Sequence, residues 1–222
     1  MATIFDDTFA GPGELNGHVS DFGEPWFAFY RDDSPSPGPV GDVNVGLTHP
    51  LYPSGFGYPI MAVTDGAFLV GEGTWYVKCE FEIVEIPSSP QGVMEFGLYE
   101  TSDGQLCATR FNVWDASVKF LYQPFGAPEP PDPTSVWDQI ALGFNSMVMI
   151  LTAAESGTST MRLLFNDVEV MEFTSDNVWP SSKPYLLIRA DAPIKITRFS
   201  VSDGSVASPE FWTRIVRAAE TP

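Results

Sequence analysis

The stretch TWYVKCEFEI at residues 74–83 decides the fold class of this chain. Apolar side chains occupy every odd position from Trp75 to Ile83, while lysine and glutamate occupy positions 78, 80 and 82. Side chains of a β-strand alternate between two faces, so this period of two predicts a strand with one buried face.

Apolar segments with strand character recur along most of the remaining chain and predict an all-β protein. Asp103-Gly104 and Asn166-Asp167 stand where tight turns would join neighbouring strands. A break in the alternation near Arg198 predicts a β-bulge. The further predicted strands span residues 93–99, 106–113, 118–122, 140–151 (one long or two short strands), 161–165, 168–173, 185–189 and 194–201.

The content of turn-forming residues agrees with many short strands. The 222 residues include 20 Pro and 19 Gly, a density that favours strands joined by irregular loops over a helical bundle. Proline is concentrated in residues 31–59 and 124–134, which predicts two long surface loops. Such loops either contact partners or cover open sheet edges.

The C-terminus has a different pattern, which predicts one short helix. Ser208-Pro209-Glu210 supplies an N-cap, a first-turn proline and an early acid, and apolar residues then recur at helical spacing. We therefore divide the chain into a β-sandwich domain, residues 1–206, and a C-terminal helical tail, residues 207–222. The tail either packs on its own sandwich or docks on a neighbouring subunit. Its candidate interface residues are Phe211, Trp212, Ile215 and Val216.

The charge of the chain excludes some classes of partner. Eleven Lys and Arg against 29 Asp and Glu give a formal net charge of −18, which repels nucleic acid and anionic lipid. The first residues, MATIFDDTFA, lack the basic start and apolar core of a signal peptide. We therefore expect synthesis in a cytoplasm, with no nucleic-acid and no membrane partner.

Few residues suggest catalysis, so we expect no enzyme. The two histidines, His18 and His49, have no second ligand at metal-binding spacing, and Cys79 and Cys107 lie in apolar strand patterns as structural thiols. Glu80 and Glu82 share a strand face, as glycosidase carboxylates do, but alternating acids are common on exposed strands.

Two further sets of residues suggest ligands rather than catalysis. We expect no cofactor, with a calcium site left open because hard cations prefer oxygen ligands. Such a site would use Asp6, Asp7, Asp32 or Asp33 with loop carbonyls. Three tryptophans at or near loops would suit stacking on sugars, although core positions are the commoner place for tryptophan. These three are Trp114, Trp137 and Trp179.

The segment near the N-terminus carries a family resemblance. Asp-x-Phe is followed by Leu-x-x-His-x-x-Asp-x-Gly and a tryptophan, a pattern that resembles tailed-bacteriophage virion proteins with a concanavalin A-like jelly roll, a sandwich of two antiparallel sheets. We expect a structural role for this motif, in which His18 and Asp21 hydrogen-bond and bring the first strand against the last. The motif residues are Asp7, Phe9, Leu15, His18, Asp21, Gly23 and Trp26.

The resemblance implies a non-enzymatic virion protein. The first hypothesis is capsid decoration or a minor capsid protein, a homo-oligomer that attaches to capsid or tail proteins. The alternative is a tail-associated, lectin-like protein that binds host carbohydrate. A glycosidase that uses Glu80 and Glu82 is the third hypothesis.

Overall fold

The structure is a computed structural model that describes most of the chain. The described residues are 2–11, 13–30, 42–43, 46–48, 60–64, 68–69, 73–86, 92–100, 106–122, 130–153, 158–175, 181–188 and 193–204. The predicted C-terminal helix and its interface residues lie outside this set. So do the Asp103-Gly104 turn, His49, Asp32, Asp33 and Trp179.

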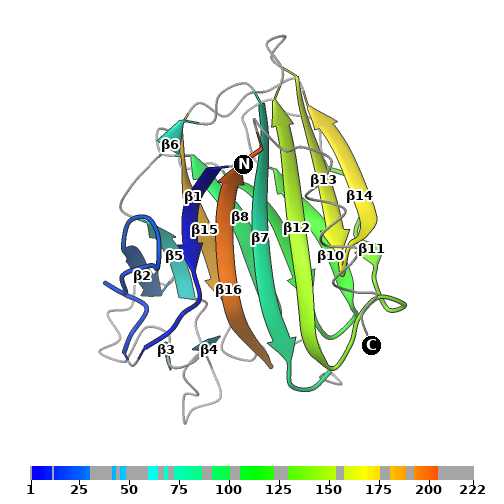
Figure 1. The fold of residues 1–222 in the computed structure, drawn as a ribbon. Coiled ribbons are helices and arrows are strands. Elements are labelled where there is room, and N and C mark those ends of the chain that lie inside the picture. Colours follow the sequence, from blue (N-terminus) through cyan, green and yellow to red (C-terminus); the bar gives the residue numbers. More distant parts are fainter. Residues whose placement is uncertain are drawn as a thin grey trace, which may run out of the picture.

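Two antiparallel sheets face each other, as predicted (Figure 1). We call them sheet A and sheet B. Sheet A has the order β14 (Val168–Ser175), β13 (Ser159–Phe165), β12 (Gly143–Ala153), β7 (Gly73–Ile83), β16 (Ile194–Asp203), β4 (Leu47–Thr48) and β3 (Asp42–Val43), and β1 (Ala2–Asp7) also pairs with β16. Sheet B has the order β11 (Thr134–Ser135), β10 (Ser117–Tyr122), β9 (Leu106–Asn112), β8 (Val93–Glu100), β15 (Ser181–Ile188), β5 (Ile60–Thr64) and β2 (Trp26–Tyr30), and β6 (Phe68–Leu69) pairs with β15.

The strand that decided the fold class lies inside sheet A. In β7 the odd-numbered residues from Trp75 to Ile83 are buried, and the even-numbered residues between them are partly exposed. This strand pairs with β12 over eleven residues and with β16 on its other side. β7 is therefore an interior strand of sheet A, buried on one face and paired on both edges. The predicted alternation is confirmed.

The core fills the space between the two inner faces. It is rich in phenylalanine and methionine, with Phe81, Phe111 and Phe165 in mutual ring contact across the sheets. Cys79 and Cys107 are fully buried free thiols, as predicted. Each contributes one sulfur contact between the layers: Cys79 of β7 to Met94 of β8, and Cys107 of β9 to Met161 of β13.

Several local predictions are confirmed and others are corrected. Asn166 and Asp167 both adopt positive φ, of 46° and 66°, in the turn between β13 and β14. The register of β16 on β7 shifts between Ile196 and Arg198, which is the predicted bulge. The first proline-rich segment contains the two-residue strands β3 and β4, and the second ends where β11 begins. These strands were not predicted, because two residues are too few to show an alternation. The segment predicted as one long or two short strands at residues 140–151 forms a single strand, β12 (Gly143–Ala153).

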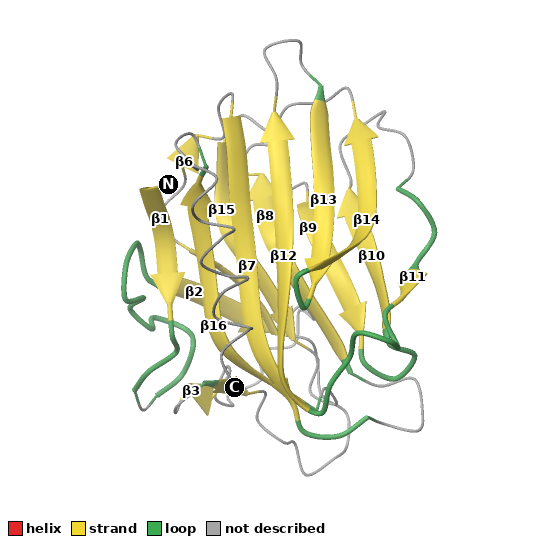
Figure 2. Ribbon diagram, turned by 45° about the vertical axis from the view of Figure 1, so that its right-hand side comes forward, coloured by secondary structure: helices red, strands yellow, loops and turns green. Residues whose placement is uncertain are grey.

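The described part of the chain consists of strands and connecting loops (Figure 2). None of its segments forms a helix with the length and apolar character required to cross a lipid bilayer.

Candidate functional site

An open groove of about 450 Å³ lies on the outer face of sheet A. Four neighbouring strands, β7, β12, β13 and β14, together with the Asn166-Asp167 turn, supply its lining. The lining residues are Thr74, Tyr76, Ile150, Thr152, Arg162, Leu164, Asp167 and Glu169.

Strand register explains why these side chains meet. Tyr76 pairs with Ile150, and Ile150 pairs with Arg162, so the three form one row across the sheet. Ile150 and Leu164 are only 4% and 6% exposed although they point away from the core. They form an apolar floor, and the ring of Tyr76 stands beside it.

Charged groups border the floor on the β13–β14 side. Arg162 donates from Nε to Glu169 Oε2 at 2.9 Å, and Glu172 Oε2 lies 3.9 Å from the same nitrogen. The hydrogen bond that Arg162 donates to Glu169 is the largest cause of the raised pKa of Arg162. The guanidinium therefore stays charged and is held in one orientation, with donors and acceptors available at the groove rim.

Hydroxyl groups border the other end of the groove. Thr74 Oγ1 and Thr152 Oγ1 lie 3.4 Å apart across β7 and β12. The same row continues outside the groove, where Thr160 Oγ1 and Thr174 Oγ1 lie 3.2 Å apart. The groove thus combines an apolar floor, one aromatic ring, hydroxyls and charged hydrogen-bonding groups.

The residues of the N-terminal motif form a separate, buried cluster around Asp7. Its carboxylate accepts hydrogen bonds from Trp26 Nε1 at 2.6 Å, from Phe9 N at 2.7 Å and from His18 Nε2 at 3.1 Å. Burial raises the pKa of Asp7, and the three donors oppose that shift. A carboxylate whose oxygens are already used by three donors has a structural role.

One expected contact in this motif was wrong. His18 bonds to Asp7 rather than to Asp21, and Asp21 Oδ2 accepts from Thr8 N at 2.8 Å and Thr8 Oγ1 at 2.5 Å. Those two bonds lower the pKa of Asp21. The broader expectation is confirmed, because β1 pairs with β16, the last strand.

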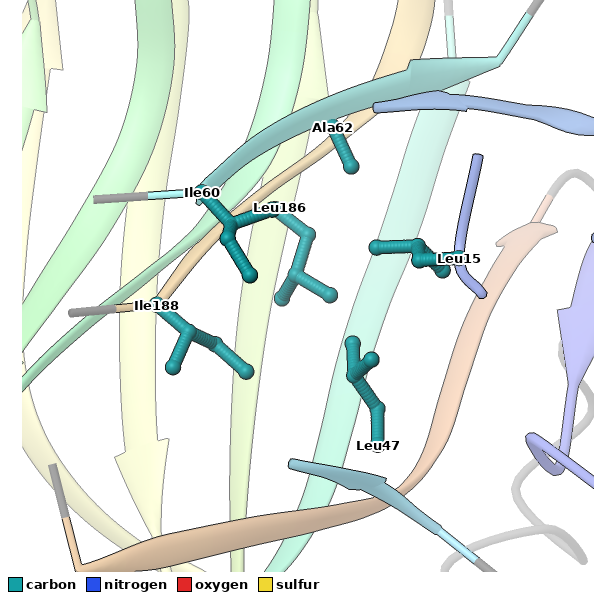
Figure 3. Close-up of a pocket in the computed structure, with 6 residues that line it drawn as sticks. All are labelled: Leu15, Leu47, Ile60, Ala62, Leu186 and Ile188. Atoms are coloured by element: carbon teal, nitrogen blue, oxygen red, sulfur yellow. The ribbon is translucent and has the colours of Figure 1, made fainter. Parts of the chain in front are cut away.

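The other motif residues fill space at this end of the sandwich. Gly23 has φ +114°, and a Cβ there would lie 2.7 Å from the Phe5 ring. Leu15 is 1% exposed and closes a small apolar pocket too tight for water (Figure 3). Its neighbours in that pocket are Leu47, Ile60, Ala62, Leu186 and Ile188.

Three of the acidic residues weighed for catalysis or calcium, Glu80, Asp6 and Asp7, have basic or donor partners. Glu80 forms an ion pair with Lys78 at 2.5 Å, and Arg198 lies opposite it on β16. Asp6 accepts two hydrogen bonds from Arg198, at 2.8 and 2.7 Å. In the described ranges no three His, Cys, Asp or Glu side chains gather as metal ligands. Calcium binding stays a prediction.

The four tryptophans that the structure describes divide into two groups. Trp26 and Trp75 are buried in the core. Trp114 and Trp137 are 38% and 48% exposed, so the preference for core positions was wrong for these two. Both lie in turns, where a large ring is not forced inward by strand pairing.

Sheet B carries a polar cluster that sequence reasoning missed. Glu95 is 1% exposed, and it accepts hydrogen bonds from Arg110 Nε at 2.7 Å and from Tyr185 Oη at 2.9 Å. Arg110 lies opposite Glu95 in the β8–β9 register. Arg110 and Tyr185 satisfy the buried carboxylate, so we assign this cluster a structural role.

Comparison with known proteins places the fold. No family model matches the chain, and no curated protein matches it. The endo-1,3-beta-glucanase from Streptomyces sioyaensis has a TM-score of 0.61 at 10% identity, over 90% of this chain and 95% of that chain. The Emp47p carbohydrate recognition domain has a TM-score of 0.54 at 9% identity, over 90% of this chain and 95% of that chain. The metal-free Emp46p carbohydrate recognition domain has a TM-score of 0.56 at 9% identity, over 79% of this chain and 87% of that chain. The predicted concanavalin A-like jelly roll is confirmed, and at these identities the likeness concerns the fold alone.

Proposed function

We propose that this protein binds carbohydrate, without cleaving it, in the groove on the outer face of sheet A. The observation that carries the proposal is the groove lining, where Tyr76 and an apolar floor lie between hydroxyls and a fixed Arg162–Glu169 pair. A sugar presents apolar C–H faces and a rim of hydroxyls, so it requires this mixture of surfaces. The structural neighbours that are carbohydrate recognition domains support the same reading.

The partners of Glu80 and Glu82 support binding without cleavage. Glu80 is paired with Lys78, and Glu82 lies opposite Lys195 in register, so both acids of the glycosidase hypothesis stand beside cations. A glycosidase needs two carboxyls free to act on the scissile bond, whereas the Glu80 carboxylate is already held by Lys78.

The setting that we propose is a bacteriophage virion, with the protein associated with the tail and in contact with host glycans. This setting is supported by the resemblance of residues 7–26 to virion proteins. Capsid decoration rests on the same resemblance and stays a prediction, as does assembly into a homo-oligomer. Immunogold labelling of virions would distinguish tail from capsid.

The binding proposal is tested on a glycan array, with calcium and then with chelator, followed by calorimetry on the best oligosaccharide. Tyr76→Ala should weaken binding at least tenfold, and Tyr76→Phe should retain most of it because the ring remains. Silence of the wild-type protein on the array under both conditions would overturn the proposal.

A matched pair of variants separates the groove from the rest of the sheet face. Thr152→Ala removes a hydroxyl that lines the groove, and Thr160→Ala removes an equivalent hydroxyl outside it. Only Thr152→Ala should weaken binding. Release of reducing ends from the bound glycan, lost in Glu82→Gln, would contradict the non-enzymatic reading.

A further inference from the structure

We infer that Trp114 and Trp137 form a second carbohydrate-contacting surface, at one edge of sheet B and separate from the groove. This inference shares the ligand class of the proposed function but concerns different residues on the other sheet. Its ligand is the exposed face of a polysaccharide, against which two indole rings stack.

The two tryptophans flank a single backbone contact. Val136 N donates to Ala116 O at 2.7 Å, and this bond extends the pairing of β10 with β11. Trp114 precedes Ala116 by two residues, and Trp137 follows Val136 directly. Their turns are therefore neighbours, although 23 positions separate the two residues in the sequence (137 − 114).

Buried residues hold the backbone of both turns in place. Val113, Ala116 and Val136 are each fully buried, so the backbone on either side of the indoles is fixed in the core. Asp115 Oδ1 closes the first turn by accepting from Ser117 N at 3.1 Å and Ser117 Oγ at 2.6 Å. The second turn is closed by Gln139 N and Ile140 N, which both donate to Val136 O at 3.0 Å. Rings on a fixed backbone lose little conformational entropy when a ligand stacks on them.

The two indoles have unused hydrogen-bonding capacity. Trp26 donates its indole N–H to Asp7, whereas within the described ranges neither Trp114 nor Trp137 donates one or contacts another aromatic ring. An exposed ring with a free donor matches a sugar, which offers a C–H face beside hydroxyl acceptors.

The surroundings favour a sugar over a protein partner. The core of a protein interface surrounds its aromatic anchors with apolar side chains, and polar groups lie at its rim. Here the neighbours along the turns are polar: Asp115, Ser117, Ser135 and Asp138. Because the indoles project from turns at a sheet edge, they suit an extended chain rather than a sugar enclosed in a cavity.

The test is retention on insoluble polysaccharides. The full-length protein is mixed with cellulose, chitin, β-1,3-glucan particles and purified peptidoglycan, and the bound fraction is measured. We expect retention on at least one surface, with a tenfold loss in the Trp114→Ala/Trp137→Ala double variant. Trp→Phe at both positions should lose less than Trp→Ala. Phe144→Ala removes a 59% exposed aromatic on sheet A and should have no effect.

The two proposals fail separately. Tyr76→Ala should leave retention on the polysaccharide unchanged, and the tryptophan variants should leave oligosaccharide binding in the groove unchanged. Retention of the wild-type protein on none of the four surfaces would overturn this inference. It would also be overturned if sedimentation velocity showed an oligomer that Trp114→Ala dissociates, because the indoles would then be a protein interface.

Discussion

Trp26 donates its indole N–H to Asp7 Oδ2 at 2.6 Å, and this bond connects the two sheets of the sandwich. Asp7 is the last residue of β1 in sheet A, and Trp26 is the first residue of β2 in sheet B. Both side chains are buried, at 0% and 1% exposure. The intervening loop folds back along them, where Gly17 N donates to Trp26 O and Trp26 N donates to His18 O.

Asp7→Asn should destabilise the protein by about 1–3 kcal/mol, the usual cost of an unsatisfied buried donor. Two of the three donors, Trp26 Nε1 and Phe9 N, reach different oxygens of the carboxylate. An amide replaces one of those oxygens with NH₂, so one donor loses its acceptor. Urea unfolding followed by circular dichroism measures the change.

Asp21→Asn is the matched control. Thr8 N and Thr8 Oγ1 both donate to the same oxygen, Asp21 Oδ2, which the amide carbonyl of asparagine can replace. Asp21 is exposed, so solvent screens the electrostatic interaction that the substitution removes. A loss of stability in Asp21→Asn equal to that in Asp7→Asn would contradict the assigned role of the cross-sheet bond.

The same two aspartates should affect stability with opposite pH dependence. The pKa of Asp7 is raised above 3.8 by burial, so its contribution is fully present below pH 3.8 and is lost as pH rises through the native value. The pKa of Asp21 is lowered by its bonds from Thr8, so its contribution is present above pH 3.8 and is lost as pH falls. Between about pH 3 and pH 6, the destabilisation by Asp7→Asn should shrink with rising pH and that by Asp21→Asn should grow. If the destabilisation by the two variants changed in the same direction with pH, the opposite pKa shifts of Asp7 and Asp21 would be contradicted.

Leu15→Ala should destabilise the protein by about 2–5 kcal/mol, since the side chain is fully buried among aliphatic neighbours. The loss should appear as a lower urea midpoint. Leu142→Ala is the control, because that leucine is 67% exposed and its truncation should change the midpoint little. Equal losses would show that the loop does not close the pocket in solution.

The two thiols should be unreactive in the native protein. Burial raises the pKa of Cys107 to about 12 and also raises that of Cys79, so neither is a thiolate near pH 8. A thiol-specific reagent should label neither cysteine in native buffer and both in denaturant. Rapid native labelling of either residue would contradict its burial.

Periodicity alone predicted the long strands. In β7 and β16, each strand is buried on one face, so burial leaves its alternation in the sequence. Even the bulge between Ile196 and Arg198 was visible, because an extra residue interrupts that alternation. By contrast, β3, β4 and β11 have two residues each and leave no period to detect.

The groove was not predictable in the same way. Tyr76, Ile150 and Arg162 come from three strands, and only their register places them in one row. Thr152 and Glu169 have no local pattern that marks them as neighbours. The partner of His18 was mistaken for a related reason: Asp21 is three residues away in sequence, but the loop turns the ring toward Asp7, eleven residues away.

The all-β class, the burial of the two thiols and the positions of the long strands were predictable from the sequence, because each leaves a local pattern of apolar and polar side chains. The tertiary structure decided which strands are neighbours and therefore which outward-facing side chains share a surface. It also decided that Trp26 is buried and hydrogen-bonded while Trp114 and Trp137 remain exposed. The same residue type has these different environments because burial depends on packing between distant segments, which no local pattern records.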